Sequence, residues 1–161
     1  MRKDLLVKVA VLGFVALSSC ENATGVDGSE LVGSWREETI RLSPTGTLER
    51  TFSFGSSGEF TWGGQSFGVY TGQPANQLSA YFRIEGSYRV DSGKLILSPR
   101  RSVTWDRFYG ASSPERVEEV SGNSGYFDNA MYSVRRGVLT LHYTSYPADA
   151  PVATTMVLSR L

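Results

Sequence analysis

The sequence predicts an all-β domain whose strands form an antiparallel up-and-down meander that closes into a β-barrel of about 8–10 strands. The 161-residue chain is rich in aromatic residues (12%) and in glycine (17 residues), and it lacks long segments of helical periodicity. Turn signals recur about every 8–12 residues, a spacing typical of sandwiches and barrels. One hairpin pattern occurs twice, and closure of consecutive hairpins removes exposed sheet edges.

Nine segments have the pattern expected of strands. Glycine in the turns between several of them supplies the positive φ that tight hairpins require. These turns are predicted at 44–46, 55–58, 91–93 and 136–137. In chain order, the predicted strands are 34–42, 48–54, 59–63, 80–90, 94–100, 103–109, 127–135, 138–146 and 152–160.

The repeated hairpin is the strongest organisational signal in the chain. Residues 88–97 match residues 132–141, with a tyrosine, a valine, a glycine and two leucines at corresponding positions. Side chains two positions apart lie on the same face of a strand, so each hairpin presents one apolar face.

Two stretches, 64–79 and 110–124, lack this rhythm and are predicted to be long loops. Loops of such length in a compact domain are usually either functional or simply mobile, and both interpretations stay open. The segment 102–131 is compatible with one strand or with two.

The predicted interior of the barrel is apolar and largely aromatic. In a small barrel such side chains can fill the interior outright, or they can line a ligand cavity, and the sequence leaves both alternatives open. From strand parity, the interior residues are Trp35, Phe52, Phe54, Phe60, Trp62, Phe82, Ile84, Tyr88, Leu95, Leu97, Tyr132, Val134, Leu139, Leu141, Tyr143, Met156 and Leu158.

The first twenty residues have the pattern of a targeting segment and not of a folded element. Arg2 and Lys3 provide a positive start, residues 9–17 are an unbroken apolar run, and Leu17-Ser18-Ser19 leads into Cys20, the one cysteine of the chain. The apolar run is too short for a transmembrane helix, which needs about 20 residues.

This segment resembles the signal of bacterial lipoproteins, in which an apolar residue and two small residues precede a cysteine. The resemblance implies that 1–19 is a signal peptide and that Cys20 takes a thioether-linked diacylglycerol with acyl chains such as palmitate. Residues 20–30 then form a flexible tether, and 31–161 form the folded domain. We therefore expect a membrane partner through the anchor at Cys20 and a place in the bacterial cell envelope.

The residue after the cysteine indicates the membrane in which the protein is anchored. In enterobacterial lipoproteins an aspartate at this position favours the inner membrane, so Glu21 favours the outer membrane. Two or three acyl chains hold a protein firmly on a membrane surface, whereas one chain does so only weakly.

The composition after removal of residues 1–19 excludes several classes of partner and site. The remaining 142 residues carry 13 basic and 15 acidic side chains, a net charge of −2, which argues against nucleic acid binding. With Cys20 acylated the domain has no free thiol, and therefore no disulfide and no thiolate metal site. No cofactor is indicated.

The opening Leu-Val-Gly-Ser-Trp and an arginine near the end of the last strand resemble the lipocalin-like domains of bacterial lipoproteins. In lipocalins a Gly-x-Trp motif, here Gly33 and Trp35, begins the first strand and the tryptophan closes one end of the barrel. The resemblance implies that Arg160 packs across Trp35, a cation–π contact of about 0.5–2 kcal/mol.

Strand parity brings several polar side chains to the predicted interior. If Trp35 points inward, Glu37 and Thr39 do so as well, and Arg50 shares its face with the apolar residues of its strand. Glu37 and Arg50 can therefore form a polar contact that orients a ligand head group, or they can be solvated charges at a barrel end. The predicted ligand-binding residues are Glu37, Arg50, Phe52, Trp62, Phe82, Tyr88 and Tyr143.

The sequence contains no recognisable catalytic or metal-binding pattern, so we do not expect an enzyme. His142 alternates with apolar neighbours and is predicted to face solvent, and no metal-ligand partners stand at useful spacing. The paired carboxylates Glu118 and Glu119 lie in a polar loop, where solvation is the ordinary outcome.

Two functions follow as expectations. The first is a lipoprotein whose barrel binds a small apolar or amphipathic ligand. The alternative is an envelope structural or protein-interaction lipoprotein, including inhibitor-like proteins, with a filled barrel and functional loops. Fold alone does not decide between the two.

Overall fold

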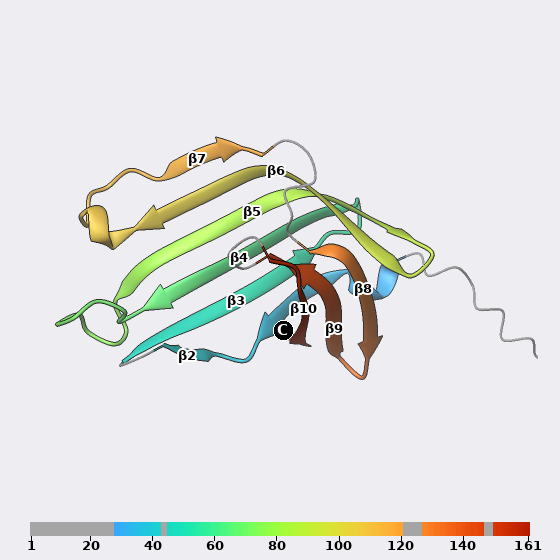
Figure 1. Cartoon of the computed structure of the whole chain (residues 1–161), viewed down its shortest axis with the longest axis horizontal. Helices are drawn as coiled ribbons and strands as arrows, with labels where there is room; N and C mark the ends of the chain where they lie inside the picture. The colour runs from blue at the N-terminus through green and yellow to red at the C-terminus, as the bar shows by residue number, and fades with distance from the viewer. Residues whose placement is uncertain (1–27, 43–44, 121–126, 147–149) are drawn as a thin grey trace, which may run out of the picture.

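The computed structural model describes residues 28–42, 45–120, 127–146 and 150–161, which form ten strands and two short 3-10 helices (Figure 1). The predicted signal peptide, Cys20 and most of the tether lie outside the described residues. Among the residues described, no helix has the length and apolar character needed to span a membrane.

The elements are named by their order in the chain. The 3-10 helices are η1 (Ser29–Leu31) and η2 (Arg107–Tyr109). The strands are β1 (Gly33–Glu37), β2 (Ile40–Leu42), β3 (Gly46–Phe54), β4 (Glu59–Phe67), β5 (Leu78–Asp91), β6 (Lys94–Asp106), β7 (Arg116–Glu119), β8 (Asp128–Arg135), β9 (Val138–Ser145) and β10 (Val152–Arg160).

The strands form a closed antiparallel barrel. Hydrogen bonding runs in the order β1-β10-β9-β8-β6-β5-β4-β3, and β1 also pairs with β3, which closes the ring of eight strands. The two remaining strands lie outside the ring, with β2 paired to β3 and β7 paired to β6. The predicted all-β, up-and-down, lipocalin-like barrel is confirmed.

The repeated hairpin pattern forms two hairpins, β5–β6 and β8–β9. Each turns through two residues of positive φ, Ser92 (51°) and Gly93 (79°) in the first and Arg136 (51°) and Gly137 (77°) in the second. Positive φ at both central residues defines the turn that matches the twist of paired strands. The sequence repeat is therefore a repeat of turn geometry as well as of apolar face.

The first predicted strand is divided in the structure. The register of β1 on β3 (Arg36 opposite Thr51) and that of β2 on β3 (Ile40 opposite Leu48) differ by one residue. Such an extra residue moves the side chains that follow it to the opposite faces. The prediction that Thr39 points inward with Trp35 and Glu37 is therefore wrong, because Thr39 lies in this break and is exposed.

Other strand boundaries also differ from the prediction. Strand β4 continues to Phe67 and β5 begins at Leu78, so the predicted 64–79 loop is shorter. The two strands predicted at 94–100 and 103–109 are one strand, β6, followed by η2. The predicted 110–124 loop contains β7, whose four residues are all exposed.

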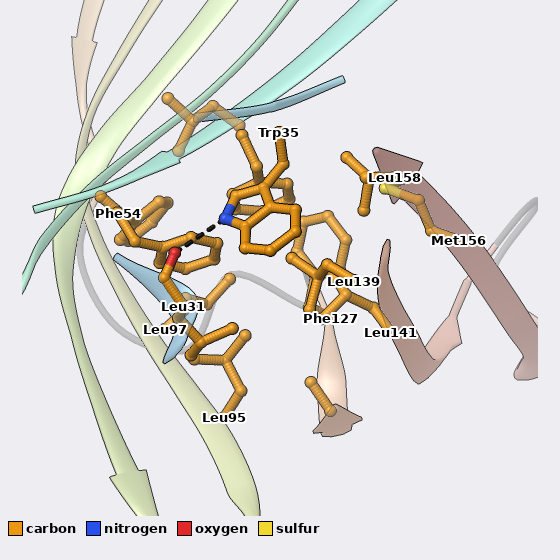
Figure 2. Packing of buried hydrophobic residues seen from close by; sticks show 14 residues of the cluster. Leu31, Trp35, Phe54, Leu95, Leu97, Phe127, Leu139, Leu141, Met156 and Leu158 are labelled. Carbon is orange, nitrogen blue, oxygen red and sulfur yellow. Dashed lines mark hydrogen bonds between the residues drawn. The ribbon is translucent and has the colours of Figure 1, made fainter. Parts of the chain in front are cut away.

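Almost the whole core was predictable from strand parity (Figure 2). Every residue of the predicted interior is either buried in one hydrophobic cluster or packed against it. Three further members, Leu31, Phe127 and Ala130, were not predicted. Leu31 and Phe127 enter from segments that flank strands, where the alternation of a strand gives no guidance.

One end of the barrel is closed by Trp35, Leu31 and Arg160. The Trp35 indole is fully buried and donates a hydrogen bond from Nε1 to the Leu31 carbonyl at 2.7 Å (Figure 2). The Arg160 guanidinium lies 4.4 Å from the centre of the indole and donates to the carbonyls of Val32 (3.1 Å) and Glu30 (2.9 Å). Residues 28–30, expected to belong to the tether, thus belong to the folded domain.

The other end of the sheet is open. Strands β3 to β6 extend beyond the shorter β8 to β10, and β7 adds to the edge of this extension (Figure 1). Helix η2 lies at the tip of the extension, whereas η1 lies at the opposite end of the molecule (Figure 1). The inner face of the extension is therefore not covered by a facing sheet.

Candidate binding site

Glu37 and Arg50 meet where the barrel interior opens onto the extension. Arg50 donates to both carboxylate oxygens of Glu37, from Nε at 2.5 Å and from a terminal nitrogen at 2.8 Å. The side chains are 25% (Arg50) and 17% (Glu37) exposed, so the pair is largely withdrawn from water. A two-pronged guanidinium–carboxylate contact fixes the orientation of both groups.

A connected series of aromatic rings begins near this ion pair. Phe127 lies 4.5 Å from Tyr143 and 4.8 Å from Trp62, measured between ring centres, and Trp62 meets Phe82 edge to face at 4.8 Å. Burial raises the pKa of Tyr143; nearby Arg50 opposes this rise and Glu37 adds to it. Tyr143 thus lies near Glu37 and Arg50, and the ring contacts continue from it through Phe127 to Trp62 and Phe82.

Two of the predicted ligand-binding residues lie elsewhere. Phe52 is fully buried and stacks between Phe54 and Trp62, so it supports the site from within the core. Tyr88 donates its hydroxyl to the Gly55 carbonyl at 3.0 Å and packs edge to face on Phe54. Strand parity identified the correct face for both residues but carries no information about their height along the barrel axis.

A groove of about 620 Å³ adjoins the ion pair on the inner face of the extension. Cross-strand register aligns its floor in two rows, Leu48–Ser66–Ala80–Asp106 and Gly64–Phe82–Thr104. Gly64 stands opposite Arg50, so the second row leads directly to the ion pair. We call this hollow the open-end groove.

Small residues in β4 and β5 create the open-end groove. Gly64, Ser66 and Ala80 occupy its floor. A Cβ at Gly64 would lie 2.5 Å from the Phe82 ring and 3.3 Å from the Arg50 side chain. Glycine therefore allows the Phe82 ring and the Arg50 side chain to meet over the sheet.

Polar contacts fix the outer border of the groove. Asp106 accepts hydrogen bonds from the Tyr70 hydroxyl and from the Phe108 backbone amide, and it thereby caps η2. The bond to Asp106 is the largest cause that raises the pKa of Tyr70 to about 12. The Arg116 guanidinium lies 4.8 Å from the centre of the Tyr109 ring.

A second pair of rings lies beside the groove. Tyr81 and Trp105 stack at 5.9 Å, and the Trp105 indole donates to the Ser113 carbonyl at 3.1 Å. The Tyr81 hydroxyl donates to Glu115, which raises the pKa of Tyr81. Both rings border the open-end groove, and Tyr81 also borders a second hollow of about 410 Å³ with outward-facing residues such as Thr51 and Arg83.

Residues at the tip were missed by the sequence analysis. Tyr70, Asp106 and Tyr109 fall in or beside segments predicted as loops or as the end of a strand, where no periodic pattern marks a face. Phe127 was also missed as a site residue, and it has a positive φ of 61°. A side chain other than glycine in that conformation is unusual and requires support from its surroundings.

The structure offers no metal centre within the part of the chain that it describes. No three histidine, cysteine, aspartate or glutamate side chains there are grouped so that they could hold a metal ion. His142 is exposed and hydrogen-bonds Thr155 at 2.9 Å, as its predicted outward position allows. Glu118 and Glu119 are exposed on β7.

A scan against protein-family models and a search of curated proteins each found no match to this chain. The geometry of the site and the motifs of the sequence are therefore what indicate function.

Proposed function

We propose that this protein is a lipid-anchored binding protein of the bacterial cell envelope that holds a small amphipathic ligand in the open-end groove. The anchor is the acylated Cys20, and Glu21 favours the outer membrane. The proposal assigns a binding role and no catalytic activity to this site.

The observation that carries the proposal is the hollow built by Gly64, Ser66 and Ala80 beside a fixed ion pair. Ligand pockets are typically about 300–1,000 Å³, mostly apolar, with a few oriented polar groups. The open-end groove has this size and this composition, with Leu48 and Phe82 as apolar contacts and Asp106 and Arg116 at its border.

The groove is a better candidate than the interior of the barrel. Trp35, Phe52, Leu139 and Leu141 are fully buried in the core, and Phe127 packs against Phe52 at 5.3 Å. Side chains thus fill the part of the barrel that a deep ligand would occupy. A ligand bound in the groove would still reach the ion pair at the row of Gly64 and Arg50.

Native mass spectrometry of the full-length protein, extracted from a bacterial envelope in mild detergent, tests the proposal. We expect a small molecule that is released on unfolding and that can be identified after extraction. Ser66→Leu fills the groove floor and should abolish the adduct. Ser133→Leu, the same substitution at an exposed position of β8, is the control and should retain it. An adduct that persists in Ser66→Leu would contradict binding in the groove.

The anchor has its own test. Cys20→Ser should abolish metabolic incorporation of labelled palmitate and release the protein from the membrane fraction. Label retained by this variant would contradict the lipoprotein assignment without bearing on the groove.

Interaction with an envelope protein is the second candidate function. Phe108 is 74% exposed and Val117 is 52% exposed, and both lie in or beside the predicted loops 64–79 and 110–124. Strand β7 pairs only with β6 among the described strands, so its outer edge is available to a partner. A wild-type protein that shows no bound small molecule would favour this candidate over the first.

A further inference from the structure

We propose that the ligand of the open-end groove is a saccharide chain, recognised by the aromatic and carboxylate side chains at the tip of the extension. This inference rests on the proposed function and names the chemical class of its ligand. A pyranose ring is amphipathic, with an apolar C–H face and a rim of hydroxyls. It therefore suits a site that alternates ring faces with hydrogen-bonding groups.

The first observation is a set of aromatic rings at the extension that lie outside the hydrophobic core. The rings form two groups: Tyr81 stacks on Trp105, and Phe108 contacts Tyr70 and Tyr109; none of the five belongs to the core cluster. Phe108 (74%) and Tyr109 (63%) are among the most exposed large side chains of the described residues. Exposed rings gain little from burial in the free protein, so a concentration of them indicates a contact surface.

The second observation is that these rings are held in place by groups that also bind hydroxyls. Tyr70 and Tyr81 donate to Asp106 and Glu115, and the Trp105 indole is tied to a backbone carbonyl. Arg116 lies over Tyr109. Rings that are already oriented lose less conformational entropy on binding, and carboxylate and guanidinium groups beside them can bind vicinal hydroxyls.

The third observation is the shape of the groove. Its floor crosses β3, β4, β5, β6 and β7, and neighbouring strands lie about 4.8 Å apart, so the floor is ~19 Å across. This width accommodates a short saccharide chain better than a single ring. An acyl chain gains most from an enclosed apolar cavity, whereas this groove has Ser66, Thr104 and Asp106 among its lining.

The fourth observation is the position of the groove relative to the proposed anchor. The chain between Cys20 and Gly28 continues from η1, at the opposite end of the molecule from η2 (Figure 1). Eight residues span at most about 28 Å. The groove thus lies at the end of the domain opposite the point where the chain leads to the proposed anchor, so binding there would not require contact with the lipids that hold Cys20.

Binding of defined glycans to the full-length protein in detergent micelles tests this inference. The probes are soluble oligomers of β-linked N-acetylglucosamine, soluble glucan oligomers and purified peptidoglycan sacculi. The readouts are isothermal titration calorimetry for the oligomers and co-sedimentation for the sacculi. Tyr109→Ala removes a ring that lines the groove, whereas Tyr146→Ala removes an exposed ring that neither lines the groove nor belongs to the rings at the tip.

We expect at least one probe to bind, and Tyr109→Ala to weaken its binding about tenfold, because a ring face that stacks on a ligand contributes on that order. Tyr146→Ala should bind as the wild type does. Binding lost equally in both variants, or retained in both, would overturn the assignment to the groove.

Failure of this inference and failure of the proposed function can be told apart. No binding to any of the three probes, together with a co-purifying lipid that is lost in Ser66→Leu, would overturn the saccharide assignment and retain the groove as a ligand site. No glycan binding and no adduct in the wild-type protein would overturn both.

Discussion

The ion pair of Glu37 and Arg50 is the residue-scale feature that most clearly joins fold and site. Both side chains come from positions that point inward, and at 17% and 25% exposure neither is fully hydrated. Withdrawing charges from water is costly unless the partner compensates, so loss of one member leaves the other in an unfavourable environment. The pair can therefore be dissected by a double-mutant cycle.

Arg50→Met should lower the free energy of unfolding by about 1–3 kcal/mol, since Glu37 is left partly buried without its partner. The double variant Glu37→Gln/Arg50→Met should regain part of this loss because no charge remains. Urea unfolding of the two single variants and the double variant gives the coupling energy. Strictly additive effects would mean that the two groups behave as independent solvated charges.

Tyr70 makes the stability of the tip depend on pH. Its pKa is raised from 10.0 to about 12, chiefly by the hydrogen bond to Asp106 and further by burial. A raised pKa in the folded state means that the contribution of Tyr70 is complete below pH 10.0 and is lost as the pH rises toward 12. The wild type should therefore lose its stability advantage over Tyr70→Phe across this interval.

Urea unfolding of the wild type and of Tyr70→Phe at a series of alkaline pH values measures this effect. Tyr70→Phe keeps the ring that lies 6.1 Å from Phe108 and removes only the hydroxyl. A difference between the two proteins that stays constant through the interval would show that Tyr70 does not titrate with a raised pKa.

At the scale of elements, the β8–β9 hairpin depends on the backbone conformation of its turn. Gly137 has a φ of 77°, and no atom lies within 4 Å of the place where its Cβ would be. Gly137→Ala should therefore destabilise the protein through the backbone alone, by about 1–2 kcal/mol. Gly137→Asn should cost less, since asparagine tolerates this conformation better. Thermal unfolding compares the two, and equal losses would exclude a conformational cause.

The elements that alternate cleanly were predictable, and those that serve the groove were not. Strand β10 was predicted to the residue, because Met156 and Leu158 alternate with exposed neighbours. The end of β4 was missed because a strand that borders a hollow carries Gly63, Gly64 and Ser66 in place of large apolar residues. Strand β7 was missed because it is an exposed edge, and its charged residues give no apolar alternation.

The candidate site was predictable to a similar extent. Parity alone brought Glu37 and Arg50 to one face, and the structure joins them. The outer half of the groove depends on where β6 ends and on how the chain from η2 returns to pair β7 with β6. Both features are set by strand pairing between distant parts of the chain. The sequence around Tyr109 and Arg116 has no local pattern that predicts their contact.

At the scale of the whole molecule, one end of the barrel is closed and the other is open. The end near η1 is closed by Trp35, which is fully buried, and by Arg160 across it. The opposite end carries η2 (Figure 1), and Tyr109 of η2 lines the open-end groove. Stability and binding should consequently respond to substitutions at different ends.

Arg160→Ala tests this division. It removes the contact with the Trp35 indole and the hydrogen bonds to Glu30 and Val32 that join η1 to the last strand. Because Arg160 is exposed to solvent, we expect the free energy of unfolding to fall by only about 1–2 kcal/mol. Arg160→Lys should recover less than half of this loss, since an ammonium group cannot span two carbonyls and an indole face as a planar guanidinium does.

Ligand affinity should change less than about twofold in either variant, because a distant and independent site couples weakly. A variant that loses affinity in step with stability would show that the closed end also sets the geometry of the groove, and that the barrel transmits strain along its whole length.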